Sequence, residues 1–414
     1  MEEAEYLLIG GGLAGGYAAS AIRERDRDGR VTLIANENHI PYDRVPLSKA
    51  YLTGKTRLEN LFFRKREFYE QNKIQLLTNR TAAAVDRKNR LVTLDDGTEI
   101  RYGRLLIATG GKVRKIGLSG SELKRVYYLR TIEDCEAIKA EMSGSRRAVV
   151  IGGGFIGCEL AAAFSSHGLE TTIIEVAPTL LSVALDSETA GWIGDYFTKK
   201  GVKVLTNTSA IQFVGEAGKV TGVETTGGNI PADFVAVGVG IIPNTELAER
   251  AGLKTDKGVI VDEFLETEER GIFAAGDVAR FYSPLFKHHI RLEHYDVAVK
   301  HGKTAGANMA GERRSFSDLP YFFSFMFELS INVYGDVAAR EKTVRRGSMN
   351  SGKGFFQFYL AGNKVVAFLS MNRGREEINL AKKLVLDGKR IEGEMLSDES
   401  RNLETFLRDS RAPS

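Results

Sequence analysis

Apolar residues fall into short strand-like runs and longer helix-like stretches along the chain, and one order of these elements occurs twice. First, an apolar strand over 5–9 is followed by a glycine-rich turn, a helix over 13–25 and a strand over 31–35. Later, a strand over 148–151 leads through a similar turn into a helix over 156–167. This order predicts parallel strands joined by a crossover helix.

The rest of the chain continues this mixture of strands and helices. The run Asp95-Asp96-Gly97-Thr98 predicts a tight hairpin. Thr131, with Asp134 three residues later, opens a helix with the character of a capping box. The other predicted elements are strands over 105–108, 171–174, 234–238, 272–277, 355–360 and 364–369, and helices over 65–71, 297–310 and 375–386.

This order of elements predicts an α/β protein of several domains. A chain of 414 residues is long for a single core. The strand from 272 resembles a member of the first sheet, so we expect the chain to return to its first domain. We expect two Rossmann-like dinucleotide-binding domains, over 1–118 with 247–319 and over 119–246, and a C-terminal α+β domain over 320–414.

Both glycine-rich turns have the pattern G-x-G-x-x-G, and they lie about 140 residues apart. In each, glycine permits a tight turn, close approach of the backbone to a pyrophosphate, and close helix–strand packing. Two such turns, each between a strand and a helix, predict two bound dinucleotides, and the simplest use of two is electron transfer between them. The turns comprise Gly10, Gly11, Gly12, Leu13, Ala14 and Gly15, and Gly152, Gly153, Gly154, Phe155, Ile156 and Gly157.

Composition excludes several classes of function. The chain is 43% hydrophobic and 27% charged, with a net charge of +3, which is ordinary for a globular protein and does not suggest a nucleic-acid partner. Cys135 and Cys158 form no C-x-x-C pair, so we expect no disulfide relay. We expect no metal site, no signal peptide and no membrane span, and a cytoplasmic protein.

Four separated motifs make the whole chain resemble the two-dinucleotide flavoprotein reductases, a group that includes ferredoxin and rubredoxin reductases, monodehydroascorbate reductase and apoptosis-inducing factor. The motifs are the two glycine turns, the segment 106–110 and the segment 272–278. The loop 41–49, Pro-Tyr-Asp-Arg-Val-Pro-Leu-Ser-Lys, is similar to this subgroup in particular. The resemblance implies FAD on the first turn and a nicotinamide dinucleotide on the second.

The resemblance also implies which residues bind FAD. Besides the first turn, these are Arg44, Lys49, Ala83, Ala108, Thr109, Gly110, Arg130, Gly276 and Asp277. A helix N-cap is the alternative for Asp277, and it is compatible with ligand binding. The acidic residue expected near the adenosine ribose falls on Asn36, and the neighbouring Glu37 is the alternative for that role.

On the nicotinamide side, the second strand of the repeat ends in Glu175. A carboxylate there accepts hydrogen bonds from ribose hydroxyls and repels a 2′-phosphate, so we expect NADH to be preferred over NADPH. The alternative is a surface glutamate. The resemblance places Val239 and Gly240 under the nicotinamide, and Glu293, His294 and Tyr295 near the flavin. Phe323 matches an aromatic residue against the flavin, with ordinary core packing as the alternative.

Glu159 lies in an otherwise apolar helix, where a carboxylate is costly to bury unless it is paired. The resemblance places it beside Lys49 at the junction of flavin and nicotinamide. We therefore expect a Lys49–Glu159 ion pair and assign catalytic roles to both residues. The alternative is a glutamate that faces solvent.

We expect an NADH-dependent FAD oxidoreductase, a monomer or a homodimer, that passes electrons to a small ferredoxin- or rubredoxin-type protein. The alternatives are a monodehydroascorbate- or quinone-type reductase, with a small-molecule acceptor, and a redox-responsive NADH-binding flavoprotein like apoptosis-inducing factor. Val299 and Phe323 argue against an ascorbyl substrate, since they stand where that enzyme has an arginine and a tyrosine. A basic docking face is one hypothesis for Arg313, Arg314, Arg345, Arg346, Arg373 and Arg375; scattered solubilising charges are the other.

Overall fold

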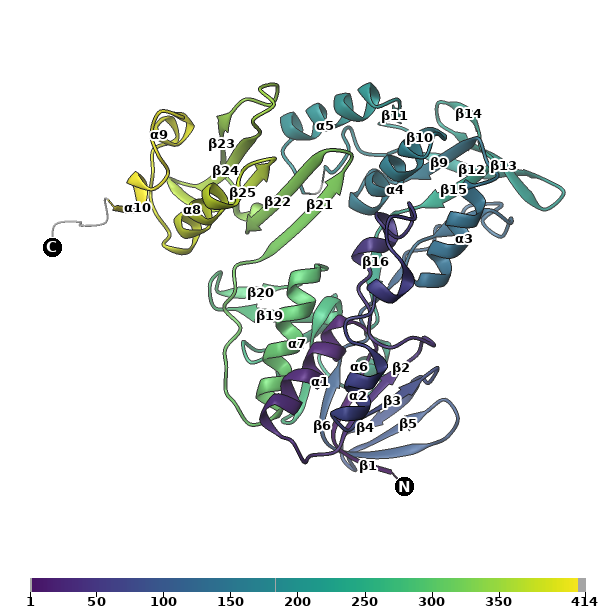
Figure 1. Cartoon of the computed structure of the whole chain (residues 1–414), viewed down its shortest axis with the longest axis vertical. Helices are drawn as coiled ribbons and strands as arrows, with labels where there is room; N and C mark the ends of the chain where they lie inside the picture. Colours follow the sequence, from purple (N-terminus) through teal and green to yellow (C-terminus); the bar gives the residue numbers. More distant parts are fainter. Residues whose placement is uncertain (1, 183, 409–414) are drawn as a thin grey trace. The chain divides into compact units, whose positions relative to one another are not determined.

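The computed structural model describes residues 2–182 and 184–408 and divides the chain into two compact units (Figure 1). Unit 1 consists of the N-terminal segment up to Pro46, Thr56–Lys112 and Ile241–Asp318. Unit 2 consists of Leu47–Lys55, Val113–Gly240 and the segment from Leu319 onward. Each unit thus gathers segments that are far apart in the sequence.

Unit 1 is built on a seven-stranded sheet of order β3-β2-β1-β6-β5-β4, with β18 paired to β6. Its central strands β3, β2, β1, β6 and β18 run parallel, while β4 and β5 form antiparallel pairs. The pairing of β18 with β6 confirms that the chain returns to its first sheet. The strands are β1 (Glu2–Ile9), β2 (Val31–Ala35), β3 (Ile74–Thr78), β4 (Ala82–Asp86), β5 (Leu91–Leu94), β6 (Glu99–Ile107) and β18 (Ile272–Ala274).

The remaining elements of unit 1 are two small sheets and several helices. One small sheet pairs β17 (Val259–Val261), β19 (Ala279–Ser283) and β20 (His288–Ile290). Another small sheet pairs β16 (Ile241–Pro243) with β7 (Gly111–Val113). The helices are α1 (Leu13–Arg25), α2 (Arg66–Gln71), α6 (Glu246–Arg250) and α7 (Tyr295–Met309), with 3-10 turns η2 (Leu58–Asn60) and η3 (Gly276–Val278).

Unit 2 contains a second parallel sheet, of order β11-β10-β9-β15-β8. Thr131 and Asp134 form the predicted capping box at the start of α3. The sheet strands are β8 (Val126–Tyr128), β9 (Arg147–Ile151), β10 (Glu170–Ile174), β11 (Lys203–Leu205) and β15 (Phe234–Val237). The helices are α3 (Ile132–Met142), α4 (Phe155–Ser166) and α5 (Ser187–Lys199), and a three-stranded antiparallel sheet joins β12 (Ala210–Glu216), β13 (Lys219–Thr225) and β14 (Gly228–Pro231).

The C-terminal part of unit 2 is an antiparallel sheet of order β21-β22-β25-β24-β23 with helices after it. Strand β24 is buried on both faces, with fully buried phenylalanines at 355, 356 and 358. These sheets confirm the predicted α/β class with two Rossmann-like domains and a C-terminal domain, while the exact domain limits stay a prediction. The elements are β21 (Tyr321–Met326), β22 (Leu329–Gly335), η4 (Val337–Ala339), β23 (Lys342–Gly347), β24 (Phe355–Ala361), β25 (Lys364–Met371), α8 (Arg375–Leu386), α9 (Gly393–Ser397) and α10 (Thr405–Arg408).

Helices α1 and α7 pack closely in unit 1, and Figure 1 shows them side by side. Gly302 and Gly306 of α7 permit this approach. A Cβ atom at Gly302 would lie 2.4 Å from the carbonyl oxygen of Ala14, and one at Gly306 would lie 2.4 Å from that of Ala18. Because Ala14 belongs to the first glycine turn, this packing fixes the helix that carries the turn.

We expect Gly302→Ala to lower the thermal midpoint of the purified protein. Alanine is the better helix former, but its methyl group overpacks the α1–α7 contact, at a cost of about 1–3 kcal/mol. Gly194→Ala in α5 is the matched control, since a Cβ there has no neighbour within 4 Å. We expect the control to gain about 0.5–1 kcal/mol. A higher midpoint for Gly302→Ala would contradict the packing described for these helices.

Candidate functional site

The first glycine turn has the backbone that the sequence pattern predicts. Gly10 has a φ of +131°, and a Cβ atom there would lie 2.0 Å from the carbonyl oxygen of Ala108. A Cβ at Gly15 would lie 2.1 Å from the carbonyl oxygen of Gly10. Side chains are therefore excluded at both positions.

The predicted FAD motifs of unit 1 converge on this turn. Gly10 lies against Ala108 and Thr109, and a Cβ at Gly276 would lie 3.2 Å from that of Ala14. The backbone N–H of Asn244 donates to the carbonyl of Gly110, and its amide side chain donates to that of Thr109 at 2.8 Å. Segments from three distant parts of the chain thus meet at the N-terminus of α1.

Of the two residues expected near the adenosine ribose, Glu37 rather than Asn36 is held in place by neighbouring side chains. Asn36 is exposed, whereas Glu37 is half-buried and pairs with the Arg44 guanidinium at 2.5 Å. The Tyr42 hydroxyl donates to the same carboxylate at 2.5 Å, and the Arg44 guanidinium also lies over the Tyr42 ring. Glu37 and Arg44, both predicted to contact FAD, are therefore brought together.

The second group of unit 1 residues surrounds Asp277. Asp277 lies inside the 3-10 turn η3, whose N-cap is Ala275, so the N-cap alternative for Asp277 is wrong. Arg291 donates to the carbonyl of Asp277 at 3.2 Å and pairs with Glu293 at 2.6 Å. Burial lowers the pKa of His294 to about 4, although Asp277 acts in the opposite direction. His294 is therefore neutral at pH 7.

Two more residues of unit 1 that were predicted to bind FAD lie at the start of a helix and on an edge strand. Tyr295 is the first residue of α7, two residues earlier than predicted, and burial raises its pKa to about 12. Ala83 lies exposed on β4.

The second glycine turn, in unit 2, repeats the geometry of the first. Gly152 has a φ of +104°, and a Cβ there would lie 2.5 Å from the carbonyl oxygen of Gly238 and 3.3 Å from Val239. A Cβ at Gly157 would lie 1.9 Å from the carbonyl oxygen of Gly152. The structure thus brings the segment 238–239 to the turn, and Gly240 follows it with a φ of +94°.

Glu175 follows β10 and holds the second turn in place. One carboxylate oxygen accepts from the backbone N–H of Gly153 at 2.5 Å, and the other accepts from that of Ala177 at 2.7 Å. An ionised carboxylate has about four acceptor sites, so capacity remains for a ligand's hydroxyl groups. Ile156 within this turn and Val176 next to Glu175 are large apolar side chains with exposed fractions of 45% and 68%.

The predicted Lys49–Glu159 ion pair is present in unit 2, with the Lys49 Nζ 2.5 Å from a carboxylate oxygen of Glu159. Only 4% of Glu159 is exposed, which rules out a solvent-facing glutamate. Lys49 follows η1 (Val45–Ser48), and its side chain keeps 18% exposure. A buried carboxylate is therefore compensated by a lysine that still reaches the surface of its own unit.

Three further predicted residues belong to unit 2. Phe155 begins α4 and packs edge-to-face against Phe322 of β21, with ring centroids 5.0 Å apart. Phe323 is half-buried and lies between the rings of Tyr321 and Phe325. Arg130 precedes the capping box and donates its backbone N–H to Asp134 at 2.8 Å.

Both turns fit a dinucleotide phosphate. Gly12 and Gly154 are the N-caps of α1 and α4; neither has a side-chain cap, and a Cβ at either would have no neighbour within 4 Å. Neither helix has an acidic residue in its first turn. The first N–H groups of a helix lack partners within the helix, and its dipole attracts anions. Each turn therefore offers an open, uncapped anion site.

Comparison with known proteins agrees with this geometry. Residues 4–302 match the protein family described as "Pyridine nucleotide-disulphide oxidoreductase". Residues 321–407 match the family described as "Reductase C-terminal".

The chain belongs to the pyridine nucleotide-disulphide oxidoreductase family.

Similar members of this family match along almost the whole chain. A ferredoxin–NAD(+) reductase component of the anthranilate 1,2-dioxygenase system of Burkholderia cepacia is 35% identical, covering 97% of this chain and 99% of its own. Putidaredoxin reductase of Pseudomonas putida is 33% identical, covering 98% and 97%. The chain is thus similar to a ferredoxin–NAD(+) reductase component and to a putidaredoxin reductase.

Solved structures extend the likeness to the fold. The putidaredoxin reductase of a covalent putidaredoxin reductase–putidaredoxin complex matches with a TM-score of 0.94 and 33% identity, covering all of both chains. A ferredoxin reductase from Rhodopseudomonas palustris matches with a TM-score of 0.92 and 33% identity, covering 97% of this chain and 99% of that one. As in this family, the protein is an FAD-dependent oxidoreductase that uses a nicotinamide dinucleotide.

Despite the family's description, this member has no pair of cysteines suited to a dithiol relay. Cys135 and Cys158 are free, buried thiols. Burial raises the pKa of Cys135 to about 12 and also raises that of Cys158. Both thiols stay protonated and unreactive at neutral pH.

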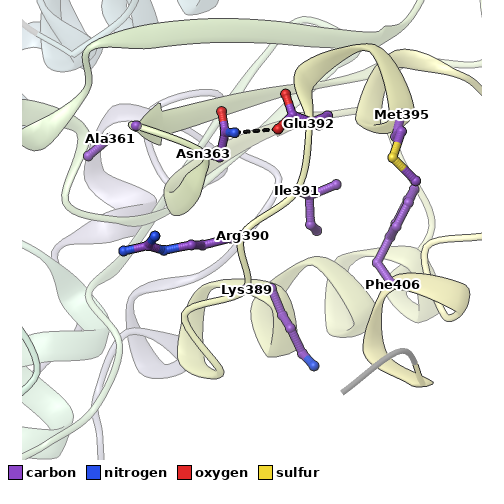
Figure 2. Close-up of a pocket in the computed structure, with 9 residues that line it drawn as sticks. Ala361, Asn363, Lys389, Arg390, Ile391, Glu392, Met395 and Phe406 are labelled. Atoms are coloured by element: carbon purple, nitrogen blue, oxygen red, sulfur yellow. Dashed lines mark hydrogen bonds between the residues drawn. The ribbon is translucent and has the colours of Figure 1, made fainter. Parts of the chain in front are cut away.

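Outside these regions the described residues offer little further chemistry. A hollow of about 570 Å³ opens beside the turn between β24 and β25, where Asn363 donates to Glu392 (Figure 2). None of the described residues that line it was predicted to bind a dinucleotide. Within the described ranges, no helix is long and apolar enough to cross a membrane, and no cluster of ligand-type side chains could hold a metal ion.

The hypothesis of a docking face of six arginines is wrong for two of them. Arg346 is 4% exposed, and its guanidinium donates to the backbone carbonyls of Leu396, Asp398 and Arg401. The Arg373 side chain is 10% exposed and pairs with Glu377 and Glu399. These guanidinium groups hold the C-terminal segment in place instead.

Sequence reasoning missed two serines that contact Glu159, namely Ser48 and Ser324. Their hydroxyl groups donate to the Glu159 carboxylate at 2.5 and 2.6 Å. A signal for each was present in the sequence. Ser48 directly precedes Lys49, and Ser324 is the one polar residue in the apolar run 322–327.

Proposed function

We propose that the protein is an FAD-dependent NADH oxidoreductase that delivers electrons to a small ferredoxin- or rubredoxin-type protein. The observation that carries this proposal is the presence of two equivalent, uncapped glycine turns in one chain. When bound, the nicotinamide dinucleotide supplies a hydride, and the flavin accepts it and releases the electrons to an acceptor. The relatives' names, which include ferredoxin and putidaredoxin reductases, support an iron–sulfur protein as acceptor.

We assign FAD to the turn at Gly10–Gly15 and the nicotinamide dinucleotide to the turn at Gly152–Gly157. On this assignment Glu37 and Arg44 organise the loop that follows β2 around the adenosine end of FAD. Asp277 would serve the ribityl and phosphate region, and neutral His294 would contact the flavin without adding charge. The cytoplasmic location and the choice between monomer and homodimer stay predictions.

We assign Lys49 and Glu159 to the junction of flavin and nicotinamide. The Lys49 ammonium would stabilise the negative charge that accumulates on a reduced isoalloxazine, and Glu159 would help hold the nicotinamide amide. A fixed charge in a site protected from water acts more strongly than it does in bulk water, because less screening surrounds it. The 4% exposure of Glu159 supports such a protected setting.

We propose NADH as the preferred coenzyme because Glu175 directly follows β10 at the second turn, the position from which a carboxylate of this fold can bind an adenosine ribose. Its carboxylate repels a 2′-phosphate, and its neighbour Val176 offers no positive charge to that phosphate. The wild-type ratio of kcat/KM for NADH to that for NADPH should therefore exceed about ten, which corresponds to about 1.4 kcal/mol.

Glu175→Gln should lower that ratio at least about fivefold, since the amide removes the repulsion and keeps one acceptor oxygen. Glu170→Gln is the matched control. Glu170 begins the same strand β10, where its carboxylate pairs with Arg146 at 2.6 Å. Steady-state kinetics with both coenzymes measure the ratio. An unchanged ratio in Glu175→Gln would exclude Glu175 as the determinant.

The acceptor assignment is tested by mixing the protein with NADH and a [2Fe–2S] ferredoxin under argon. We expect catalytic loss of the ferredoxin's visible absorbance, with a rate that saturates as ferredoxin concentration rises. If neither a ferredoxin nor a rubredoxin is reduced, whereas a quinone is, the acceptor assignment is wrong and a small-molecule reductase replaces it.

A further inference from the structure

Among the residues that the structure describes, three side chains donate to the Glu159 carboxylate. Its Oε1 atom accepts from the Ser324 hydroxyl at 2.6 Å. Its Oε2 atom accepts from the Ser48 hydroxyl at 2.5 Å and lies 2.5 Å from the Lys49 ammonium. All four residues belong to unit 2. Ser324 is thus the hydroxyl that holds the carboxylate oxygen opposite the lysine.

This cluster is almost completely buried. Ser324 is 0% exposed, Ser48 2% and Glu159 4%. Burying an ion pair is favourable only when good geometry and further hydrogen bonds offset the loss of hydration. A hydroxyl that donates to a carboxylate forms a charge-assisted bond, stronger than one between neutral groups. The serine hydroxyls therefore bear directly on where the carboxylate lies.

Strand β21 places Ser324 on the side that meets α4. Phe322, two residues earlier on the same face, packs against Phe155 at the start of that helix. Phe323 and Phe325 point to the opposite face, where their ring centroids lie 5.7 Å apart. A strand of the C-terminal domain thus delivers one hydroxyl to a carboxylate on α4.

We propose that Ser324 is a positioning residue for electron transfer from NADH. By holding Oε1, it fixes the plane of the Glu159 carboxylate, so that Oε2 stays on the Lys49 ammonium. Ser48 donates to Oε2, the same oxygen that the Lys49 ammonium contacts. The C-terminal domain then sets the place of the lysine charge. This inference rests on the proposed function, because that function gives the Lys49–Glu159 pair its role.

The first test measures the pair itself in FAD-loaded, NAD-free protein. Competitive acetylation by acetic anhydride, read residue by residue by mass spectrometry, reports how firmly the Lys49 ammonium is held. We expect Ser324→Ala to raise the acetylation rate of Lys49 several-fold. Ser370→Ala is the matched control. Ser370 is also 0% exposed on a strand of the same sheet, and its hydroxyl has no hydrogen-bond partner among the described residues.

The second test measures the consequence. In anaerobic single-turnover mixing at saturating NADH, we expect Ser324→Ala to reduce the flavin about tenfold more slowly than wild type, as for loss of one hydrogen bond to a charged group. The dissociation constant of NADH should change less than the rate does. Ser370→Ala should match wild type in both quantities. If Ser324→Ala does not fold, Ser48→Ala carries the same two expectations.

The outcomes separate the two proposals. Unchanged acetylation of Lys49 in Ser324→Ala overturns the positioning role, whatever happens to the rate. Faster acetylation with unchanged flavin reduction, both in this variant and in Glu159→Ala, upholds the positioning of Lys49 and overturns the role assigned to the pair. Equal effects of Ser324→Ala and Ser370→Ala on both readouts would reduce Ser324 to a packing residue.

Discussion

Flavin reduction by NADH should slow by about 100- to 1000-fold in Lys49→Met, the loss typical of removing one preorganised electrostatic group from an active site. Methionine keeps the length and flexibility of the side chain but removes its charge. The Glu159 carboxylate, 4% exposed, would keep its two serine donors as its side-chain partners within the described part of the chain. Because the two serine hydroxyls still donate to this buried carboxylate, we expect the variant to fold with reduced stability and to keep FAD, so that the lower rate reports the missing charge.

Two further variants serve as comparisons for that measurement. Lys49→Arg keeps the charge in a different geometry and should lose much less than Lys49→Met. Lys200→Met removes the lysine of another pair in unit 2, with Glu328 at 2.7 Å, whose members are far more exposed. It should leave the rate unchanged, since exposed ion pairs contribute little. Anaerobic stopped-flow absorbance gives all three rates. A Lys49→Met rate within about threefold of wild type would be incompatible with the proposed electrostatic role.

The two glycine turns should be separable by one substitution in each. Gly12→Asp should yield colourless protein without FAD. Gly154→Asp should yield yellow protein whose NADH dissociation constant is raised at least about 100-fold, through repulsion between a carboxylate and the pyrophosphate. Both positions have extended backbone, with φ of −86° and −74°, and open space for a Cβ. Aspartate is also a favoured N-cap, so the fold should tolerate both changes.

Flavin absorbance of the purified variants and equilibrium titration with NADH measure these effects. Gly12→Ala and Gly154→Ala are the matched controls, because they add a Cβ without a charge. They should retain most of the binding. If Gly154→Asp lost FAD while Gly12→Asp kept it, the assignment of the two dinucleotides would be reversed.

The sequence predicts those parts of the site whose chemistry is local. A glycine at 10 or 152 is required by its own backbone angle and by the carbonyl that approaches it. Glu159 is recognisable because a carboxylate in an apolar helix needs a partner, and Lys49 is the partner that the family resemblance supplies. These expectations depend on few neighbours, and the structure confirms the ion pair and both turns.

The other features of the site depend on tertiary contacts that no local sequence pattern encodes. Ser48 and Ser324 lie 111 and 165 residues from Glu159 in the sequence, so only the folded chain shows that they share its carboxylate. Arg346 resembles a surface charge in sequence, yet its guanidinium is buried on backbone carbonyls. Aspartate is a residue type that often caps a helix, but the 3-10 turn begins at Gly276, so Asp277 lies inside it.

The most direct test of the central claim is anaerobic stopped-flow mixing of the yellow protein with NADH, with flavin absorbance followed at its visible maximum. The proposed reductase should bleach completely within about one second, in the range of ordinary enzyme turnover. Bleaching over minutes, with a persistent long-wavelength absorbance and NADH-driven dimerisation, would contradict it and favour a redox-responsive NADH-binding protein.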